Sequence, residues 1–331
     1  GFVDAVSGDL RLRDDSPLLD RADPDAALLH DLEGHLRPAD QGFDIGADER
    51  YGCWARVVRG SDADQEIYGP YGNPQRAIAQ SIEGDVIEVT VGDCLGVHVY
   101  DGISQTVHIT HPLTLKGGYT RDFTSSYDNA TYPDLEEATA FHPQGAGRAL
   151  LIATEAVTVE NVSLVEGDAA EGGGNGGGLF FTVNPAMATL SQVDFYTNTA
   201  TSGGALYQPG GTLVIENSVM AYNEATYGGA LYQAGGALTV TLESEFLDNT
   251  ADQHGGALFV DGGARAALLA AADQLQLWGR NTAERGGAIY NNDNGYATID
   301  YNSLFENQAD QTGGAIYNRG DMIVENATIH E

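Results

Sequence analysis

The stretch NQADQTGGAIY, residues 307–317, recurs in near copies along the second half of the chain. The copies are NTATSGGALY from residue 198, NEATYGGALY from 223, NTADQHGGALF from 249 and NTAERGGAIY from 281. Each keeps an asparagine, an alanine, a glycine pair and an aromatic residue in the same order. A chain that repeats one pattern at regular intervals repeats one structural unit.

The repeat has the period of a solenoid. Its glycine pairs begin 25 to 31 residues apart, which is a period typical of coiled repeat folds. Short, alternating, β-branched runs lie between the pairs, in TLVIENSVM (212–220), ALTVTLESEF (237–246) and MIVENATI (322–329). We therefore predict an all-β, right-handed parallel β-helix with three short strands per coil. Roughly nine or ten coils, about 4.8 Å apart, would form a rod about 45 Å long. The glycine pairs begin at Gly176, Gly203, Gly228, Gly255, Gly286 and Gly313.

One segment of the repeat region favours a helix. ARAALLAAADQL (264–275) is rich in alanine and leucine, the residues with the highest helix propensity. It falls within the longest period, so we expect a local helical bulge at this point of the solenoid.

The recurring asparagine predicts a ladder of side chains. In a stack of coils, equivalent residues become neighbours, and an asparagine can satisfy turn backbone groups and pair its amide with those above and below. A large apolar residue precedes each asparagine by three positions and is expected to form an internal stack: Phe195, Met220, Phe246, Trp278 and Leu304. The ladder would consist of Asn198, Asn223, Asn249, Asn281 and Asn307.

The aromatic residue of the repeat predicts a second row. Because side chains alternate along a strand, it must point away from the leucine or isoleucine that precedes it. The sequence does not decide which of the two rows faces the interior. Outward aromatic rings would either stack and shield the sheet or form a stripe for sugar rings or another subunit. The aromatic row consists of Phe180, Tyr207, Tyr232, Phe259, Tyr290 and Tyr317.

These repeats resemble those of the polymorphic outer-membrane proteins, in which GGA(I/L/V) and FxxN motifs alternate. FYTN (195–198) and FLDN (246–249) match the second motif, and MAYN, WGRN and LFEN are near variants. The resemblance covers roughly residues 160–331. It implies a β-helical passenger exposed at a bacterial cell surface, with an adhesive role.

Residues 51–146 resemble the N-terminal cap and first coils of large secreted β-helix proteins of environmental bacteria. PQRAIAQSI (74–82) has the apolar spacing of a short amphipathic helix, with Ile78 and Ile82 on one face. Such a helix would cover the open end of the stack, and the repeat region would follow over residues 147–331. Cys53 and Cys94 both fall in this cap. They would form a disulfide in a secreted chain and are otherwise two buried thiols.

Residues 1–50 resemble the choice-of-anchor Q segment, which usually closes the C-terminal end of a β-helix. Gly8-Asp9, Ser16-Pro17, Arg37-Pro38 and the DIGADE run from residue 44 match its pattern. Two explanations stay open for its place at the start of this chain. The segment either finishes a preceding β-helix of a longer tandem protein, or it closes the last coil of a neighbouring copy. The second arrangement would build a head-to-tail filament.

The charge of the chain excludes two classes of partner. It carries 48 acids and 15 bases, a formal net charge of −33, with Lys116 as its one lysine. Such a surface repels nucleic acids and anionic membrane surfaces, and no apolar stretch is long enough to insert into a membrane. Calcium is the one cofactor suggested, because hard cations take several oxygen ligands. The candidate ligands are Asp20, Asp23, Asp25 and Asp31.

No catalytic or cofactor-binding residues are predicted. GxSxG, HExxH and phosphate-loop motifs are absent from the sequence. We expect an extracellular structural or adhesive protein of the cell surface, with copies of itself or surface and matrix glycans as partners. The alternative is a carbohydrate-active enzyme, a polysaccharide lyase or glycoside hydrolase, built on the same scaffold.

Overall fold

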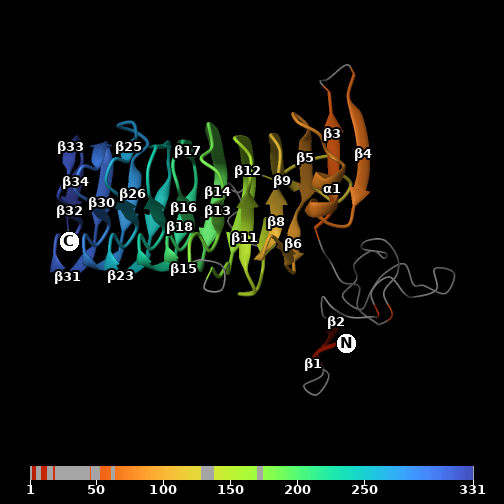
Figure 1. Cartoon of the computed structure of the whole chain (residues 1–331), viewed down its shortest axis with the longest axis horizontal. Helices are drawn as coiled ribbons and strands as arrows, with labels where there is room; N and C mark the ends of the chain where they lie inside the picture. The colour runs from red at the N-terminus through yellow and green to blue at the C-terminus, as the bar shows by residue number, and fades with distance from the viewer. Residues whose placement is uncertain are drawn as a thin grey trace.

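The computed structural model describes residues 2–4, 9–12, 18, 45, 53–60, 64–127, 138–169 and 174–330. From residue 53 onward the chain winds into about nine stacked turns that form a rod (Figure 1). The cap lies at one end of the rod and the last repeat at the other. The predicted parallel β-helix is confirmed.

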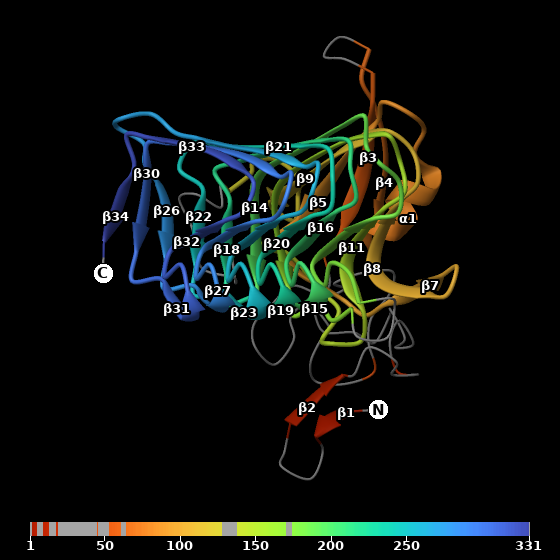
Figure 2. The ribbon, with the colours of Figure 1, turned by 60° about the vertical axis from the view of Figure 1, so that its left-hand side comes forward.

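Three mainly parallel sheets run along the described part of the rod and are seen at another angle in Figure 2. The broad sheet contains β3 (Ala55–Arg59), β4 (Glu66–Tyr71), β5 (Val86–Thr90), β6 (Gly92–Leu95), β9 (Leu113–Tyr119), β10 (Thr139–His142), β12 (Ala156–Val165), β14 (Met187–Tyr196), β17 (Thr212–Glu216), β18 (Val219–Ala221), β21 (Ala237–Thr241), β22 (Glu245–Leu247), β25 (Arg265–Leu269), β26 (Gln276–Gly279), β29 (Tyr296–Asp300), β30 (Asn302–Phe305), β33 (Asp321–Glu325) and β34 (Thr328–His330). The nine-stranded sheet contains β7 (His98–Tyr100), β8 (Ile103–Ile109), β11 (Arg148–Ile152), β13 (Leu179–Phe181), β16 (Leu206–Gln208), β20 (Leu231–Gln233), β24 (Leu258–Val260), β28 (Ile289–Asn291) and β32 (Ile316–Asn318). The five-stranded sheet contains β15 (Thr199–Ser202), β19 (Glu224–Tyr227), β23 (Thr250–His254), β27 (Thr282–Arg285) and β31 (Gln308–Thr312).

Each later coil contains four strand segments, so the prediction of three was wrong. The run predicted as one strand over 212–220 is divided into β17 and β18 by Asn217, which has a φ of 46°. A left-handed residue turns the chain and breaks the extended conformation. The preceding coil bends at the equivalent Gln192, with a φ of 56°, but remains one strand, β14.

The predicted internal stack is present. Phe195 pairs in register with Met220, Met220 with Phe246, Phe246 with Trp278, and Trp278 with Leu304. All five are buried. The rings of Phe246 and Trp278 stack with centroids 3.9 Å apart. These side chains belong to a continuous apolar core that runs along the axis of the rod.

The N-terminal cap contains the predicted helix and antiparallel pairings of β3, β4 and β7 that were not predicted. Helix α1 (Pro74–Gln80) begins after Asn73, whose side chain accepts a hydrogen bond from Arg76 N at 2.9 Å and so caps the helix. Ile78 is buried, but Ile82 lies beyond the end of the helix and is exposed, so its predicted place on the apolar face was wrong. Strands β4, β3 and β5 pair antiparallel and end the parallel stack.

Cys53 and Cys94 form a disulfide with Cα atoms 5.0 Å apart. Both residues are buried in the core. The bond links the segment before β3 to strand β6, so it ties the antiparallel cap to the first parallel coil.

The predicted helical bulge over 264–275 is wrong. Strand β25 occupies its first half and pairs in parallel with β21 on one side and β29 on the other. Hydrogen bonds to two neighbouring coils outweigh the helix propensity of alanine and leucine, which is a weak local preference. The additional residues of this coil form a turn in which Ala271 and Gln274 pair.

Most of residues 1–50 lie outside the described residues. Among the residues of this segment that are described, β1 (Phe2–Asp4) and β2 (Asp9–Leu12) pair antiparallel. The three-part division at residues 50 and 146 therefore stays a prediction.

Candidate functional site

The five asparagines form a ladder through successive coils. The Nδ2 atom of each donates to the Oδ1 atom of the next, at 2.9 Å from Asn198 to Asn223 and 3.0 Å for the later pairs. The same Oδ1 atoms accept the backbone N–H of the preceding asparagine. The second Nδ2 hydrogen is donated to a backbone carbonyl of the preceding coil, for example from Asn249 to Met220 O at 2.8 Å.

This pattern satisfies every polar group of an interior rung. Asn223, Asn249 and Asn281 are each at most 1% exposed, and each uses both amide hydrogens and both carbonyl lone pairs. The residue before each asparagine is left-handed, with a φ of 55° at Asp248 and 54° at Arg280. The chain changes direction at that residue, and the side chain of the asparagine that follows points into the core.

A second row of buried amides, interrupted by Val260, was not predicted. Gln208, Gln233 and Asn291 are fully buried in the nine-stranded sheet. Their amide nitrogens each donate at 3.0 Å to a carbonyl of the next coil, on Ala237, Arg265 and Asp321. The sequence does contain a signal for these residues, because a polar residue follows the aromatic position in several repeats. It is glutamine in both copies of ALYQ and asparagine in both copies of AIYN.

The aromatic row faces outward, and the leucine and isoleucine row faces the core. Leu206, Leu231 and Leu258 are fully buried, whereas their aromatic neighbours stack along the outside. Centroids are 5.4 Å apart for Tyr207 and Tyr232, and the following separations to Phe259, Tyr290 and Tyr317 are 4.8, 5.0 and 5.1 Å. Phe180 begins the row with a tilted ring 5.9 Å from Tyr207.

Stacking leaves few ring faces open in this row. Each interior ring has a neighbour on both faces, and His254 adds a parallel contact to Tyr290 at 4.4 Å. Phe259 is 5% exposed and Tyr290 is 3% exposed. A sugar ring cannot stack face-on against these two without opening the row. The geometry therefore favours a shielding and cohesive role for the aromatic row.

A cation closes the N-terminal end of the aromatic row. The guanidinium carbon of Arg148 lies 5.0 Å from the centroid of Phe180, within cation–π range. Arg148 stands where later coils have the second glycine of the pair, and it is 1% exposed. Burial lowers its pKa, and the charge of Asp168 opposes that effect.

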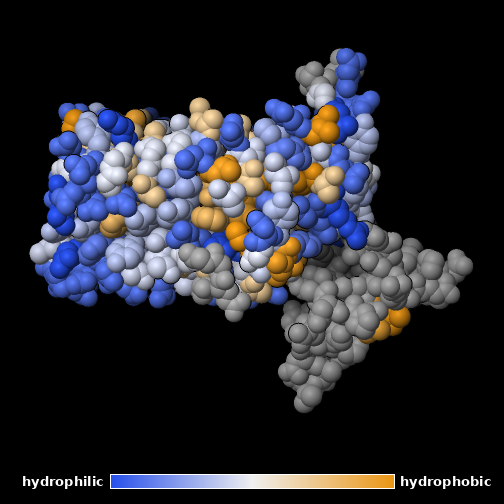
Figure 3. Space-filling model, in the orientation of Figure 1, coloured by the Kyte–Doolittle hydropathy of each residue, from blue (hydrophilic) through white to orange (hydrophobic). Residues whose placement is uncertain are grey.

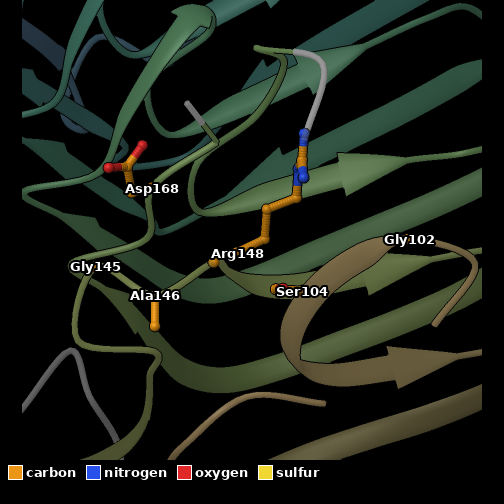
Figure 4. A pocket seen from close by; sticks show the side chains of 7 residues that line it. Gly102, Ser104, Gly145, Ala146, Arg148 and Asp168 are labelled. Atoms are coloured by element: carbon orange, nitrogen blue, oxygen red, sulfur yellow. The ribbon is translucent and has the colours of Figure 1, made fainter. Parts of the chain in front are cut away.

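A cavity of about 310 Å³ adjoins Arg148. It lies in a coil that precedes β15, the first strand of the five-stranded sheet, and small residues line much of it. Figure 4 shows the Arg148 side chain between Asp168, Gly145 and Ala146 on the left and Ser104 and Gly102 on the right.

One buried carboxyl should make stability depend on pH. The pKa of Asp194 is raised to about 7, mainly because the carboxyl is buried. Val219 N donates to its Oδ1 at 3.0 Å and lowers the pKa in part, while the negative charge of Glu245 raises it. The folded protein thus binds a proton more tightly than the unfolded chain, and stability is lost as pH rises toward 7.

We expect Asp194→Asn to remove about 2 kcal/mol of the decrease in unfolding free energy between pH 5 and pH 7. Urea denaturation at both pH values would measure it. Asp252→Asn, at an exposed carboxyl on β23, is the matched control. Equal pH dependence in the wild type and the Asp194 variant would contradict the expectation.

The calcium candidates Asp20, Asp23, Asp25 and Asp31 lie outside the described residues. Within the described ranges, no group of three or more His, Cys, Asp or Glu side chains is arranged to hold a metal ion. The same ranges contain no helix long and apolar enough to span a membrane.

Comparison with known proteins returned no similarity: no protein-family model matches the chain, and neither does any curated protein or solved structure.

Proposed function

We propose that this protein is an extracellular structural and adhesive element of a bacterial cell surface, built as a stiff β-helical rod. One observation supports this above the others: the asparagine ladder and the aromatic row run through successive coils without a break. Their side chains bind one coil to the next, which is what a rod under mechanical or proteolytic stress needs.

The physical consequence of these ladders is slow unfolding. A coil can leave the stack only when its backbone hydrogen bonds, its asparagine rung and its aromatic contact break together. Solenoids gain stability from such nearest-neighbour interfaces, and resistance to proteolysis then depends on the rate of unfolding. A buried disulfide in the cap suits an oxidising compartment and supports the extracellular assignment.

The surface of the rod is predominantly polar on the face shown in Figure 3, with hydrophobic residues in smaller groups between. Together with the net charge of −33 this favours a soluble, hydrated exterior. Surface and matrix glycans are the partners that such a surface tolerates best, because neutral sugars are not repelled by it.

Thermolysin digestion at 50 °C and binding to polysaccharide-coated beads would test the proposal together. We expect the repeat region to remain intact for hours and the protein to be retained on at least one coating. Digestion to small peptides within minutes would contradict the structural role, and absence of retention would contradict the adhesive one. Release of oligosaccharides from the same polysaccharides would favour the alternative, a carbohydrate-active enzyme.

Head-to-tail assembly remains a separate prediction. Light scattering over a hundredfold range of protein concentration would test it. We expect the mean mass to rise with concentration, and a constant monomer mass would contradict assembly.

A further inference from the structure

We propose that a pocket around Lys116, on the outer face of the broad sheet, binds one ring of a neutral saccharide. The cavity has a volume of about 270 Å³. This is slightly smaller than the pockets of about 300–1,000 Å³ that hold drug-sized ligands, and it suits a single ring of a longer chain. The side chains that carry the proposal are Lys116 and Glu160; Tyr119, Tyr127, Asn161 and Gln192 also line the cavity.

The pocket lies on a row of alternating charges. Arg56, Glu88, Lys116 and Glu160 are register neighbours on β3, β5, β9 and β12. Arg56 Nε lies 2.5 Å from Glu88 Oε2, and Lys116 Nζ lies 2.7 Å from Glu160 Oε2. In the second pair the side chains remain 38% and 32% exposed. An exposed ion pair contributes little to stability, while its open donors and acceptors are available to a ligand.

Two glycines after the lysine make room for Asn161 and Tyr127 at the edge of the pocket. A side chain at Gly118 would collide with the amide of Asn161 and with Tyr127 O, and one at Gly117 would collide with Asn161 O. Because both are glycine, Asn161 Nδ2 can donate to Gly117 O at 3.2 Å and to Tyr127 O at 2.5 Å. Tyr127 N in turn donates to Gly118 O at 2.7 Å.

These contacts fold the segment that follows β9 back over the sheet. Tyr119 pairs with Ser126 in an isolated antiparallel bridge, which brings Tyr127 to the pocket beside Lys116. The LTLKGGY sequence (113–119) thus has a specific structural result: the one lysine of the chain lines the same cavity as Tyr119 and Tyr127.

The chemistry of the lining fits a neutral sugar. The Lys116 ammonium can donate to sugar hydroxyls and the Glu160 carboxylate can accept from them, and Tyr119 and Tyr127 supply aromatic residues to the lining of the cavity. Burial, and then a hydrogen bond with Glu88, raise the pKa of Tyr119, so its hydroxyl stays protonated and uncharged. An anionic saccharide would meet the repulsion of a chain with net charge −33.

This inference assigns a binding site to the adhesive role proposed above. It rests on that adhesive role and does not rest on the proposed structural role. The stability of the rod does not depend on the pocket. If no saccharide binds at Lys116, the pocket proposal fails. Thermolysin resistance and bead retention would still test the structural and adhesive roles independently.

The single lysine allows a site-specific measurement on the full chain. Reductive methylation with ¹³C-formaldehyde labels Lys116 and the N-terminal amine, and it preserves the positive charge. We expect a saturable shift of the Lys116 methyl resonance on titration with at least one of cellohexaose, xylohexaose and mannohexaose. The N-terminal resonance should not move.

Variants then test the assignment of the pocket. In calorimetric titrations with the same hexasaccharides, Lys116→Met and Glu160→Gln should each weaken binding about tenfold, since hydrogen bonds to charged groups are lost. Arg280→Gln breaks a comparable exposed ion pair with Asp248, far along the rod, and should leave the affinity unchanged. Unchanged thermal unfolding would show that the two pocket variants fold.

Three results would overturn the proposal. They are the absence of any shift with all three neutral sugars, a larger shift with a galacturonic acid hexamer, and equal affinity of the Lys116 variant and the wild type.

Discussion

Asn249→Ala is expected to lower the free energy of unfolding by about 4 to 6 kcal/mol. The substitution leaves three buried groups without partners: the backbone N–H of Asn223, one amide hydrogen of Asn223 and the carbonyl of Met220. Each unsatisfied buried group costs about 1 to 3 kcal/mol. The alanine also leaves a small cavity at the centre of the ladder, which adds to the loss.

Guanidinium denaturation, monitored by far-ultraviolet circular dichroism, would measure this effect. Two asparagine variants provide controls. Asn307→Ala removes the last rung, which is only partly buried, so water replaces part of the lost bonding and we expect about 1 kcal/mol. Asn184→Ala, at an exposed position outside the ladder, should change stability by less than about 0.5 kcal/mol. Equal effects at positions 249 and 184 would contradict the ladder.

Gly256→Ala is expected to destabilise the protein by more than about 3 kcal/mol or to prevent folding. Gly256 has no left-handed backbone that would strain an alanine, so the effect must come from contacts. A methyl group there would collide with Gly287 O and lie 2.6 Å from Thr282 O and 2.7 Å from Thr282 N. These atoms belong to the backbone of the next coil and cannot move without separating the stack.

Gly314→Ala is the matched control for this prediction. It occupies the equivalent place in the last coil, where the nearest atom to an added methyl group is Asn307 O at 3.5 Å. We expect a change below about 1 kcal/mol, because that distance is ordinary van der Waals contact. Thermal unfolding of both variants would measure the difference. Similar melting temperatures for the two would show that close approach of the coils is not the reason for the second glycine.

The comparison of Gly256 with Arg148 illustrates the same rule. Both occupy the second position of the glycine pair, yet of these two positions only that of Arg148 has room for a side chain. The five-stranded sheet does not extend to that coil, and a cavity lies beside the arginine. The requirement for glycine therefore comes from the neighbouring coil and is not a property of the local sequence.

Sequence periodicity was sufficient for the fold, the asparagine ladder and the internal stack. Equivalent residues of a repeat must become neighbours when coils stack, so the position of Asn198 in one period fixes its partner as Asn223 in the next. The same logic would have found the buried pair Gln208 and Gln233, had the residue after each aromatic position been considered.

Periodicity was not sufficient where a neighbouring coil overrides a local preference. Residues 264–275 have helical propensity, but strands on both sides hold β25 extended. The antiparallel strands β3 and β4 of the cap are not part of the repeat, so the sequence period does not predict them. Lysine occurs once in the sequence, at position 116, and only the fold brings it into one cavity with Tyr127 and Glu160.

The amino-acid sequence by itself determined that this chain coils with a period of about 27 residues and that its asparagines, apolar residues and aromatic residues form separate rows. Tertiary structure alone decided that the aromatic row lies outside, that its ring faces are occupied, and that Lys116 and Glu160 meet in a pocket. The reason is physical. Alternation along a strand separates two faces without saying which is buried, and contacts between residues far apart in the chain depend on how the coils stack.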